Sequence, residues 1–133
     1  MEPSRRHLRR RDKQRDAAAR AQGTGGALAA VASVDGIMGS PGHVAYGCAK
    51  AGVVHLVKTL SEELGSIGVR ANAVAPGMVF VPTDETPAPG AGVQPSTPLR
   101  QPTARDIASA LVFLSSDLAL AVTRQTLAVD GGG

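Results

Sequence analysis

Three residues that can support acid/base chemistry fall close together in the segment SVDGIMGSPGHVAYGCAK, which runs from Ser33 to Lys50. Tyr46 and Lys50 are four residues apart, and side chains at that separation share one face of a helix. An ammonium beside a phenol favours the phenolate, which lowers a tyrosine pKa toward the pH at which a general acid/base works. The hydroxyl of Ser33 can orient the same substrate oxygen. The pattern indicates proton transfer at a carbinol or carbonyl oxygen.

The hydrophobic pattern around these residues predicts a strand, a helix and a second strand. Residues 27–33 are a short apolar run after glycines, and residues 43–66 carry apolar side chains at helical intervals, with a glycine-rich loop between the two. Residues 69–75 read as the second strand, which the pair Pro76–Gly77 ends. The helical face is made of Ala45, Ala49, Val53, Leu56, Val57, Leu60 and Leu64.

The remaining segments complete an alternating order of strands and helices. Residues 78–102 are rich in proline and predict a long irregular loop. Thr103 and Asp106 have the spacing of a helix capping box, and QTLAVDGGG predicts a last strand. This order indicates an α/β fold with a doubly wound, Rossmann-like parallel sheet, whose ligands bind beyond the carboxyl ends of the strands.

Length and composition narrow the class of protein further. The chain has 133 residues, enough for one modest domain, and a single cysteine, Cys48, which excludes an internal disulfide. We expect Cys48 to be a buried small apolar residue. His43 and His55 have no partners at metal-ligand spacing, so no metal site is expected. No apolar run reaches the length of a membrane span, which favours a cytoplasmic protein.

The positive charge is confined to the amino-terminal end. Residues 1–20 hold eight basic and three acidic side chains, while the rest of the chain has a net charge of −2. Residues 1–22 are therefore expected to be a basic segment, helical or disordered, before a domain at 23–133. The segment has no aromatic residue to stack on bases, so no nucleic-acid partner is expected.

Taken together, these motifs resemble the short-chain dehydrogenase/reductase family. The family pattern is a serine followed thirteen residues later by Tyr-x-x-x-Lys, as in Ser33, Tyr46 and Lys50. The similarity continues through VRANAVAPG and IASALVFLSSD to the terminal VDGG, and it covers most of residues 23–133. The match is with roughly the carboxyl-terminal half of the family's fold.

The resemblance implies an NAD- or NADP-dependent oxidoreductase that interconverts an alcohol and a ketone. Tyr46 would be the catalytic acid/base, Lys50 would also bind the nicotinamide ribose, and Ser33 would hold the substrate oxygen. Three further residues, Pro76, Gly77 and the backbone of Val79, would lie against the nicotinamide. The family also implies a homo-oligomer formed through helix 43–66, with a small-molecule alcohol or ketone as substrate.

Some positions depart from the family pattern. The glycine turn that binds the cofactor pyrophosphate has no match, since GTGG at residues 23–26 leads into a strand. The family's earlier active-site asparagine has no counterpart, and Arg124 stands where a glycine is usual. The alternative is a catalytically inactive, truncated remnant that acts at most as an association module. The identity of the substrate and the choice between NAD and NADP are not readable from the sequence.

Overall fold

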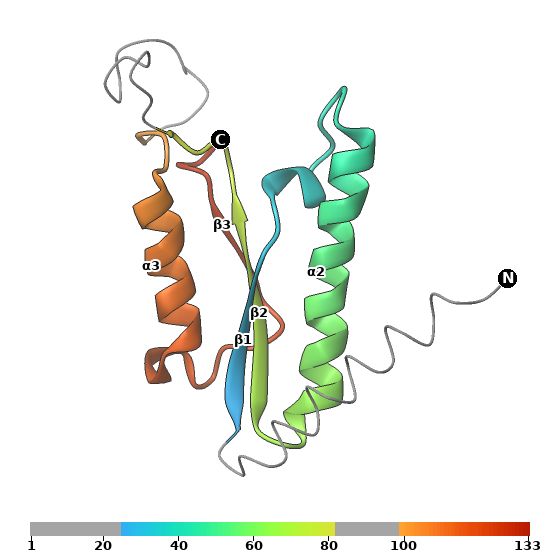
Figure 1. Cartoon of the computed structure of the whole chain (residues 1–133), viewed down its shortest axis with the longest axis vertical. Helices are drawn as coiled ribbons and strands as arrows, with labels where there is room; N and C mark the ends of the chain where they lie inside the picture. Colours follow the sequence, from blue (N-terminus) through green and yellow to red (C-terminus); the bar gives the residue numbers. More distant parts are fainter. Residues whose placement is uncertain (1–24, 82–98) are drawn as a thin grey trace, which may run out of the picture.

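The fold is a small parallel sheet with a helix on each face. The computed structural model describes residues 25–81 and 99–133; the predicted basic segment and most of the predicted proline-rich loop lie outside these residues. The elements in chain order are β1 (Gly26–Val31), the 3-10 turn η1 (Val34–Gly36), α2 (Val44–Gly65), β2 (Val69–Pro76), α3 (Ala104–Ser115), the 3-10 turn η2 (Asp117–Ala119) and β3 (Thr126–Val129). The strands are parallel in the order β1-β2-β3, with α2 and α3 on opposite faces (Figure 1). The predicted α/β fold is confirmed.

The middle strand β2 is buried on both faces, as expected for a parallel sheet covered by helices. Its alternate residues Ala71, Ala73 and Ala75 face α2 and are fully buried there. Val74 points the other way and packs under α3. The side chains that complete the α2 side are Ala32, Val57, Leu28, Ala30, Val53, Val54 and Leu60. Small side chains on the sheet let α2 approach it closely.

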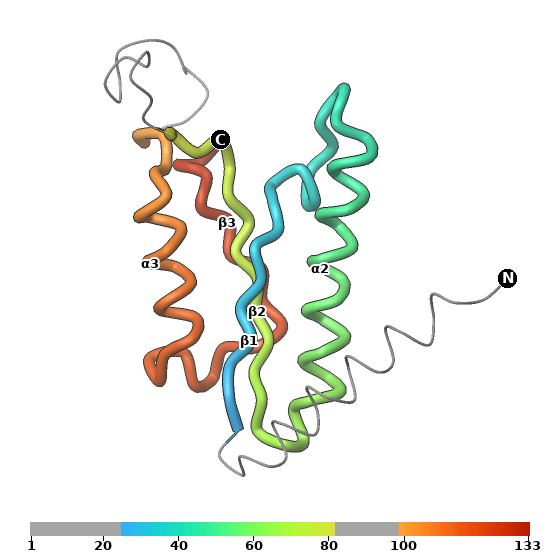
Figure 2. The backbone as a smooth tube through the Cα atoms, in the orientation of Figure 1, coloured from blue at the N-terminus to red at the C-terminus, as the bar shows by residue number. Residues whose placement is uncertain are grey.

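The carboxyl ends of all three strands lie at one end of the sheet, since the strands are parallel (Figure 2). The turn η1 follows β1 at this end, and the amino-terminal part of α2 lies beside it (Figure 1). The residues predicted to do chemistry therefore gather where ligands bind in sheets of this kind.

Helix α3 begins and ends with polar contacts. Thr103 and Asp106 form the predicted capping box, with the Thr103 backbone N–H and side chain both donating to Asp106 Oδ2, at 2.8 and 2.7 Å. At the other end, Arg70 reaches across from β2 and donates to the carbonyl oxygens of Leu114 and Ser116, at 2.8 and 3.0 Å. Arg70 thus satisfies carbonyls that the helix end leaves unpaired.

Asn72 lies fully buried on the α3 side of β2. Its Nδ2 donates to Val122 O at 2.8 Å, and its Oδ1 accepts from Gln125 N at 3.0 Å. The amide therefore joins the central strand to the segment that leads into β3. Asn72 is a structural residue here, in keeping with its place in the predicted second strand.

Several local predictions were wrong. The first strand ends at Val31, and Ser33 instead caps η1, a turn within the predicted loop. Cys48 is exposed, not buried. It lies nine residues from the buried Val57, which is two and a half helical turns, so it points to the opposite side of α2. Part of the predicted helical face is also exposed, namely Ala45, Ala49 and Leu56.

Candidate active site

The loop after β1 packs directly on the backbone of α2, and two glycines make this possible. A Cβ added at Gly36 would lie 2.6 Å from the carbonyl carbon of Lys50, and one at Gly47 would lie 3.0 Å from the carbonyl oxygen of Asp35. Only glycine at position 36 leaves room for this approach. The loop that begins at Ser33 is thereby fixed against the helix that carries Tyr46 and Lys50.

Tyr46 and Lys50 lie together on α2, as their spacing predicted. Lys50 Nζ is 5.6 Å from the centroid of the Tyr46 ring, within the range of a cation–π contact. The same ammonium donates to the carbonyl oxygen of Val31, the last residue of β1, at 3.2 Å. This contact uses one of its three protons, so others are free for a further acceptor. Tyr46 is half exposed, which leaves its hydroxyl open to a substrate.

Ser33 is buried between β1 and η1, with 8% of its surface exposed. Its Oγ accepts a hydrogen bond from the backbone N–H of Asp35 at 3.3 Å, the contact of an N-cap residue. An accepted bond does not use the hydroxyl proton, so Ser33 keeps a donor for a substrate oxygen. The structure places Ser33 in the loop that packs on α2 beside Lys50.

Pro76, Gly77 and Val79 lie where β2 ends. Gly77 N donates to Val129 O at 3.1 Å, which ties this end of β2 to β3. A Cβ at Gly77 would lie 2.7 Å from the Cβ of Asp130, so glycine is needed for the two chain segments to approach. The Val79 side chain packs into the α3 core.

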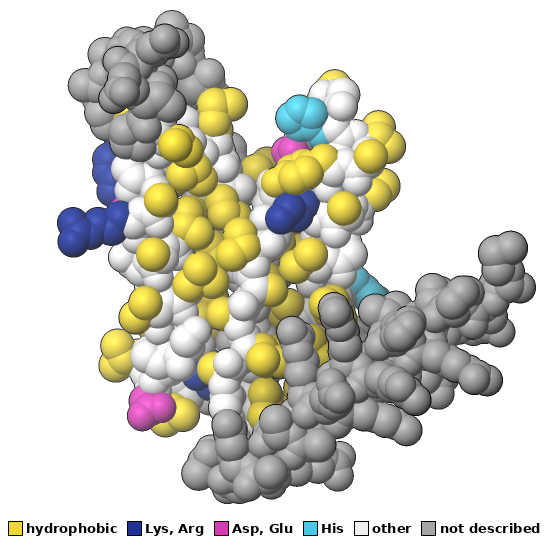
Figure 3. Space-filling view, in the orientation of Figure 1, with side chains coloured by type: hydrophobic (Ala, Val, Ile, Leu, Met, Phe, Trp, Pro, Cys, Tyr) yellow, Lys and Arg dark blue, Asp and Glu magenta, His cyan; other side chains and the backbone are white. Residues whose placement is uncertain are grey.

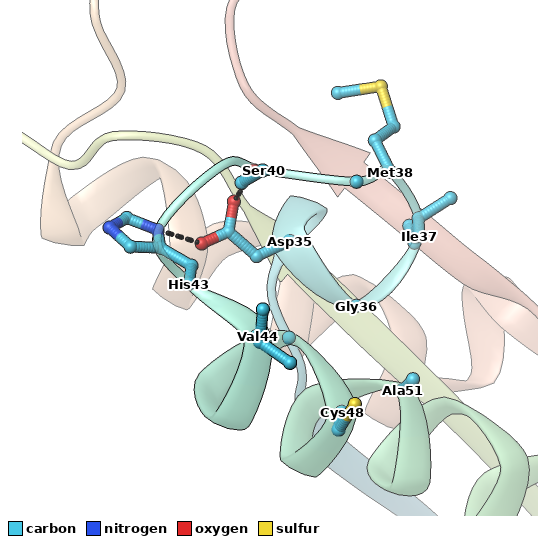
Figure 4. Close-up of a pocket in the computed structure, with 11 residues that line it drawn as sticks. Asp35, Gly36, Ile37, Met38, Ser40, His43, Val44, Cys48 and Ala51 are labelled. Carbon is cyan, nitrogen blue, oxygen red and sulfur yellow. Dashed lines mark hydrogen bonds and ion pairs between the residues drawn. The ribbon is translucent and has the colours of Figure 1, made fainter.

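A polar cluster beside α2 was not predicted as a site. Asp35 Oδ1 accepts from Ser40 Oγ at 2.6 Å, and Asp35 Oδ2 lies 2.7 Å from His43 Nδ1 (Figure 4). These hydrogen bonds, from Ser40 first and His43 second, hold the Asp35 pKa below its usual value. The cluster borders a pocket of about 290 Å³ whose apolar lining includes Ile37, Met38, Val44, Cys48 and Ala51. No short-range pattern in the sequence marks Asp35, and the spacing of His43 was considered only for metal binding.

Residues 25–81 and 99–133 hold neither a metal-ligand cluster nor a membrane-spanning helix. These residues contain no group of three or more His, Cys, Asp or Glu side chains placed to hold a metal ion. His55 is exposed on the surface of α2, as expected. No helix in the same ranges is both long and apolar enough to cross a membrane.

The described residues fit one end of a nicotinamide cofactor. Lys50 has free donors at the carboxyl end of β1, where a ribose hydroxyl could accept. A pyrophosphate needs open N–H groups at a helix start. The start of α3 instead has its capping box and an ion pair between Arg100 and Asp106, at 2.7 Å. Lys50 therefore fits the ribose of the cofactor, while the capped start of α3 does not fit a pyrophosphate.

A parallel α/β sheet with Ser, Tyr and Lys at its carboxyl end is typical of one class of oxidoreductases. Comparison of the chain with known proteins indicates the same class. The family model described as enoyl-(acyl carrier protein) reductase matches residues 14–133, almost the whole chain. The chain belongs to the short-chain dehydrogenase/reductase family.

Curated relatives and solved structures agree with this assignment. The chain is 40% identical over 112 residues to a 3-oxoacyl-(acyl-carrier-protein) reductase of Chlamydia muridarum, over 80% of this chain and 44% of the relative. It is similar to the crystal structure of acetoin dehydrogenase from Salmonella typhimurium, with 35% identity, a TM-score of 0.77 and coverage of 86% and 47%. A short-chain family oxidoreductase from Burkholderia thailandensis shows 41% identity, a TM-score of 0.75 and coverage of 86% and 47%. The chain spans less than half the length of these proteins.

Proposed function

We propose that this chain contains the acid/base residues of an NAD(P)-dependent oxidoreductase that interconverts an alcohol and a ketone. The observation that supports it most is the Lys50 ammonium over the ring of Tyr46, at the carboxyl end of the sheet. In the direction of reduction, the Tyr46 hydroxyl gives its proton to the carbonyl oxygen. In the direction of oxidation, Tyr46 removes the proton from the alcohol. Ser33 donates its free hydroxyl proton to the same oxygen and orients it.

The residues proposed to hold the cofactor lie along the same edge. Lys50 donates to the nicotinamide ribose, and Pro76, Gly77 and the backbone of Val79 form the surface beside the ring. When bound, the reduced nicotinamide supplies the hydride that the carbonyl carbon receives.

The substrate class is a small molecule with a ketone or secondary alcohol. The relatives are named for a 3-oxoacyl group and for acetoin, and both compounds carry a ketone. We therefore propose a 3-oxoacyl thioester, or diacetyl as the oxidised form of acetoin, as the first substrates to test. We also propose that the protein is cytoplasmic, as the sequence leads us to expect.

The test is a titration of NADH and NADPH into the purified chain, followed by fluorescence, with circular dichroism of the same sample. We expect saturable binding by a folded chain and reduction of acetoacetyl thioester or diacetyl. In the matched variant Tyr46→Phe, which removes only the hydroxyl, turnover should fall by at least about 100-fold while binding persists. A folded chain that binds neither nucleotide would overturn the proposal.

A second candidate function is association without catalysis, and exposed apolar surface favours it. The outward backbone groups of β1 form an open sheet edge in the described structure, and Val31 on this strand is 46% exposed. Hydrophobic side chains gather on the same face of the molecule (Figure 3). On α2, Val44 and Leu56 are 77% and 49% exposed. An open edge and uncovered apolar side chains are typical of surfaces that pair with another chain.

The proposed homo-oligomer through α2 can be tested on its own. Sedimentation velocity should show a dimer or larger species for the whole chain, and Leu56→Glu should shift it toward monomer. Thr59→Glu on the same helix is the matched control, because Thr59 is less exposed and polar. A wild-type chain that sediments as a monomer would refute the proposed homo-oligomer.

A further inference from the structure

The Asp35 carboxylate holds the His43 imidazole at the start of α2 (Figure 4). A carboxylate oxygen only accepts hydrogen bonds, so the Nδ1 atom that faces Asp35 carries the proton. The other carboxylate oxygen accepts from Ser40. The loop that carries Asp35 cannot swing away, because Gly36 and Gly47 bring it into backbone contact with α2. The imidazole is therefore tied to a fixed point of the loop.

This imidazole packs against the proposed acid/base. The rings of His43 and Tyr46 have centroids 6.3 Å apart and planes at 79°, an edge-to-face arrangement. The Tyr46 side chain is half exposed, so few other groups restrain its ring. Its aromatic and cation–π contacts among the described residues are the His43 imidazole and the Lys50 ammonium.

We propose that His43 is a positioning residue that fixes the Tyr46 ring for proton transfer, with Asp35 and Ser40 holding the imidazole. The inference rests on the proposed function of Tyr46. His43 acts through Tyr46 and does not itself exchange a proton with the substrate. The titratable groups that face the imidazole are Asp35 from the loop and Tyr46 from the first turn of α2. The hydrogen bonds that lower the Asp35 pKa keep its carboxylate charged at neutral pH.

The composition of the chain makes the test specific. Tyr46 is the only tyrosine and there is no tryptophan, so a ring-labelled tyrosine reports on this site alone in an NMR spectrum. We expect the Tyr46 ring signals to shift in His43→Gln, because this variant removes the imidazole that packs against the ring. They should stay unchanged in His55→Gln, the matched control on the exposed surface of α2.

Two further variants remove the tether while a ring stays at position 43. His43→Phe keeps an aromatic ring but loses the hydrogen bond to Asp35, and Asp35→Ala removes the tether while leaving the imidazole. Both should move the Tyr46 signals toward those of a free tyrosine. Identical Tyr46 signals in wild type, His43→Gln and Asp35→Ala, with all three folded by circular dichroism, would overturn the proposal.

Kinetics give a second readout. His43→Gln should lower kcat by about tenfold with KM little changed, because a misplaced acid/base weakens the transition state more than substrate binding. An unchanged kcat in an active enzyme would contradict the positioning role. A wild-type chain without activity would instead refute the proposed function, and the Tyr46 spectrum would still decide whether His43 holds the ring.

Discussion

The two faces of the sheet are held by different chemistry. On the α3 face, polar side chains of β2 bond to backbone groups far along the chain: Arg70 to the end of α3, and Asn72 to the segment before β3. On the α2 face, β2 presents only small alanines, and the loop beside the helix is held by backbone contact at Gly36 and Gly47. The proposed catalytic residues lie on the second face.

This difference indicates a division of tasks. Buried side chains that bond to backbone groups specify one arrangement, since leaving such groups unpaired is costly. Close packing through glycine leaves the polar side chains of the loop and α2 free for other contacts. Tyr46 and His43 are both exposed. The α3 face therefore serves stability, and the α2 face serves the proposed chemistry.

The largest effect is expected at the α3 face. Asn72→Ala would leave the Gln125 N–H without its buried partner and Val122 O with only the bond from Arg70, and should lower the free energy of unfolding by about 3 kcal/mol. The measurement is urea unfolding followed by circular dichroism. Gln125→Ala is the control, because its own exposed side chain bonds only to Thr123 O. An equal loss of unfolding free energy in Asn72→Ala and Gln125→Ala would contradict the structural role of the Asn72 amide.

The next effect concerns the glycine contact on the α2 face. Gly36→Ala would force its Cβ against the backbone of Lys50, and should cost about 2 kcal/mol in unfolding free energy. It should also change the NMR signals of Tyr46. Gly39→Ala is the matched control, since a Cβ there meets nothing within 4 Å. If both variants unfold alike, the loop is not fixed by this contact.

A smaller effect depends on pH. The Arg100 guanidinium, and then the N–H and hydroxyl of Thr103, hold the Asp106 pKa well below its usual value near 4. A carboxyl with a lowered pKa stabilises the fold above its unfolded value and loses that contribution as the pH falls through the folded value. The Tm of wild type should fall as the pH is lowered, and Asp106→Asn should reduce this pH dependence of the Tm. A variant with the same acid dependence as wild type would exclude Asp106 as its source.

The smallest effect is expected at Arg124. Its φ of 66° lies in the left-handed region that favours glycine, and its side chain pairs with the exposed Glu62. Arg124→Gly relieves the strain but loses the ion pair, so the unfolding free energy should change by only about 0.5 kcal/mol. Arg124→Val should cost more, because a β-branched residue fits this conformation poorly. The two variants would be compared by urea unfolding. A larger loss of unfolding free energy in Arg124→Gly than in Arg124→Val would contradict this expectation.

The sequence predicted the order of elements and the capping box of α3, because both depend on local periodicity and short spacing. It also placed Tyr46 and Lys50 on one helix face. It did not predict how Arg70 reaches the end of α3, since that bond joins residues 44 apart in the chain. The contact at Gly36 and the cluster at Asp35 depend on how the loop packs on α2, which no local pattern encodes.

The most direct test of the central claim is transfer of deuterium from 4-deuterated NADPH and NADH to acetoacetyl thioester and diacetyl, measured by mass spectrometry of the products. The account predicts a deuterated hydroxy product with the wild-type chain, and a loss of at least about 100-fold with Tyr46→Phe. A folded wild-type chain that forms no such product, or a Tyr46→Phe variant that forms it equally fast, would contradict the assignment of Tyr46 as the acid/base.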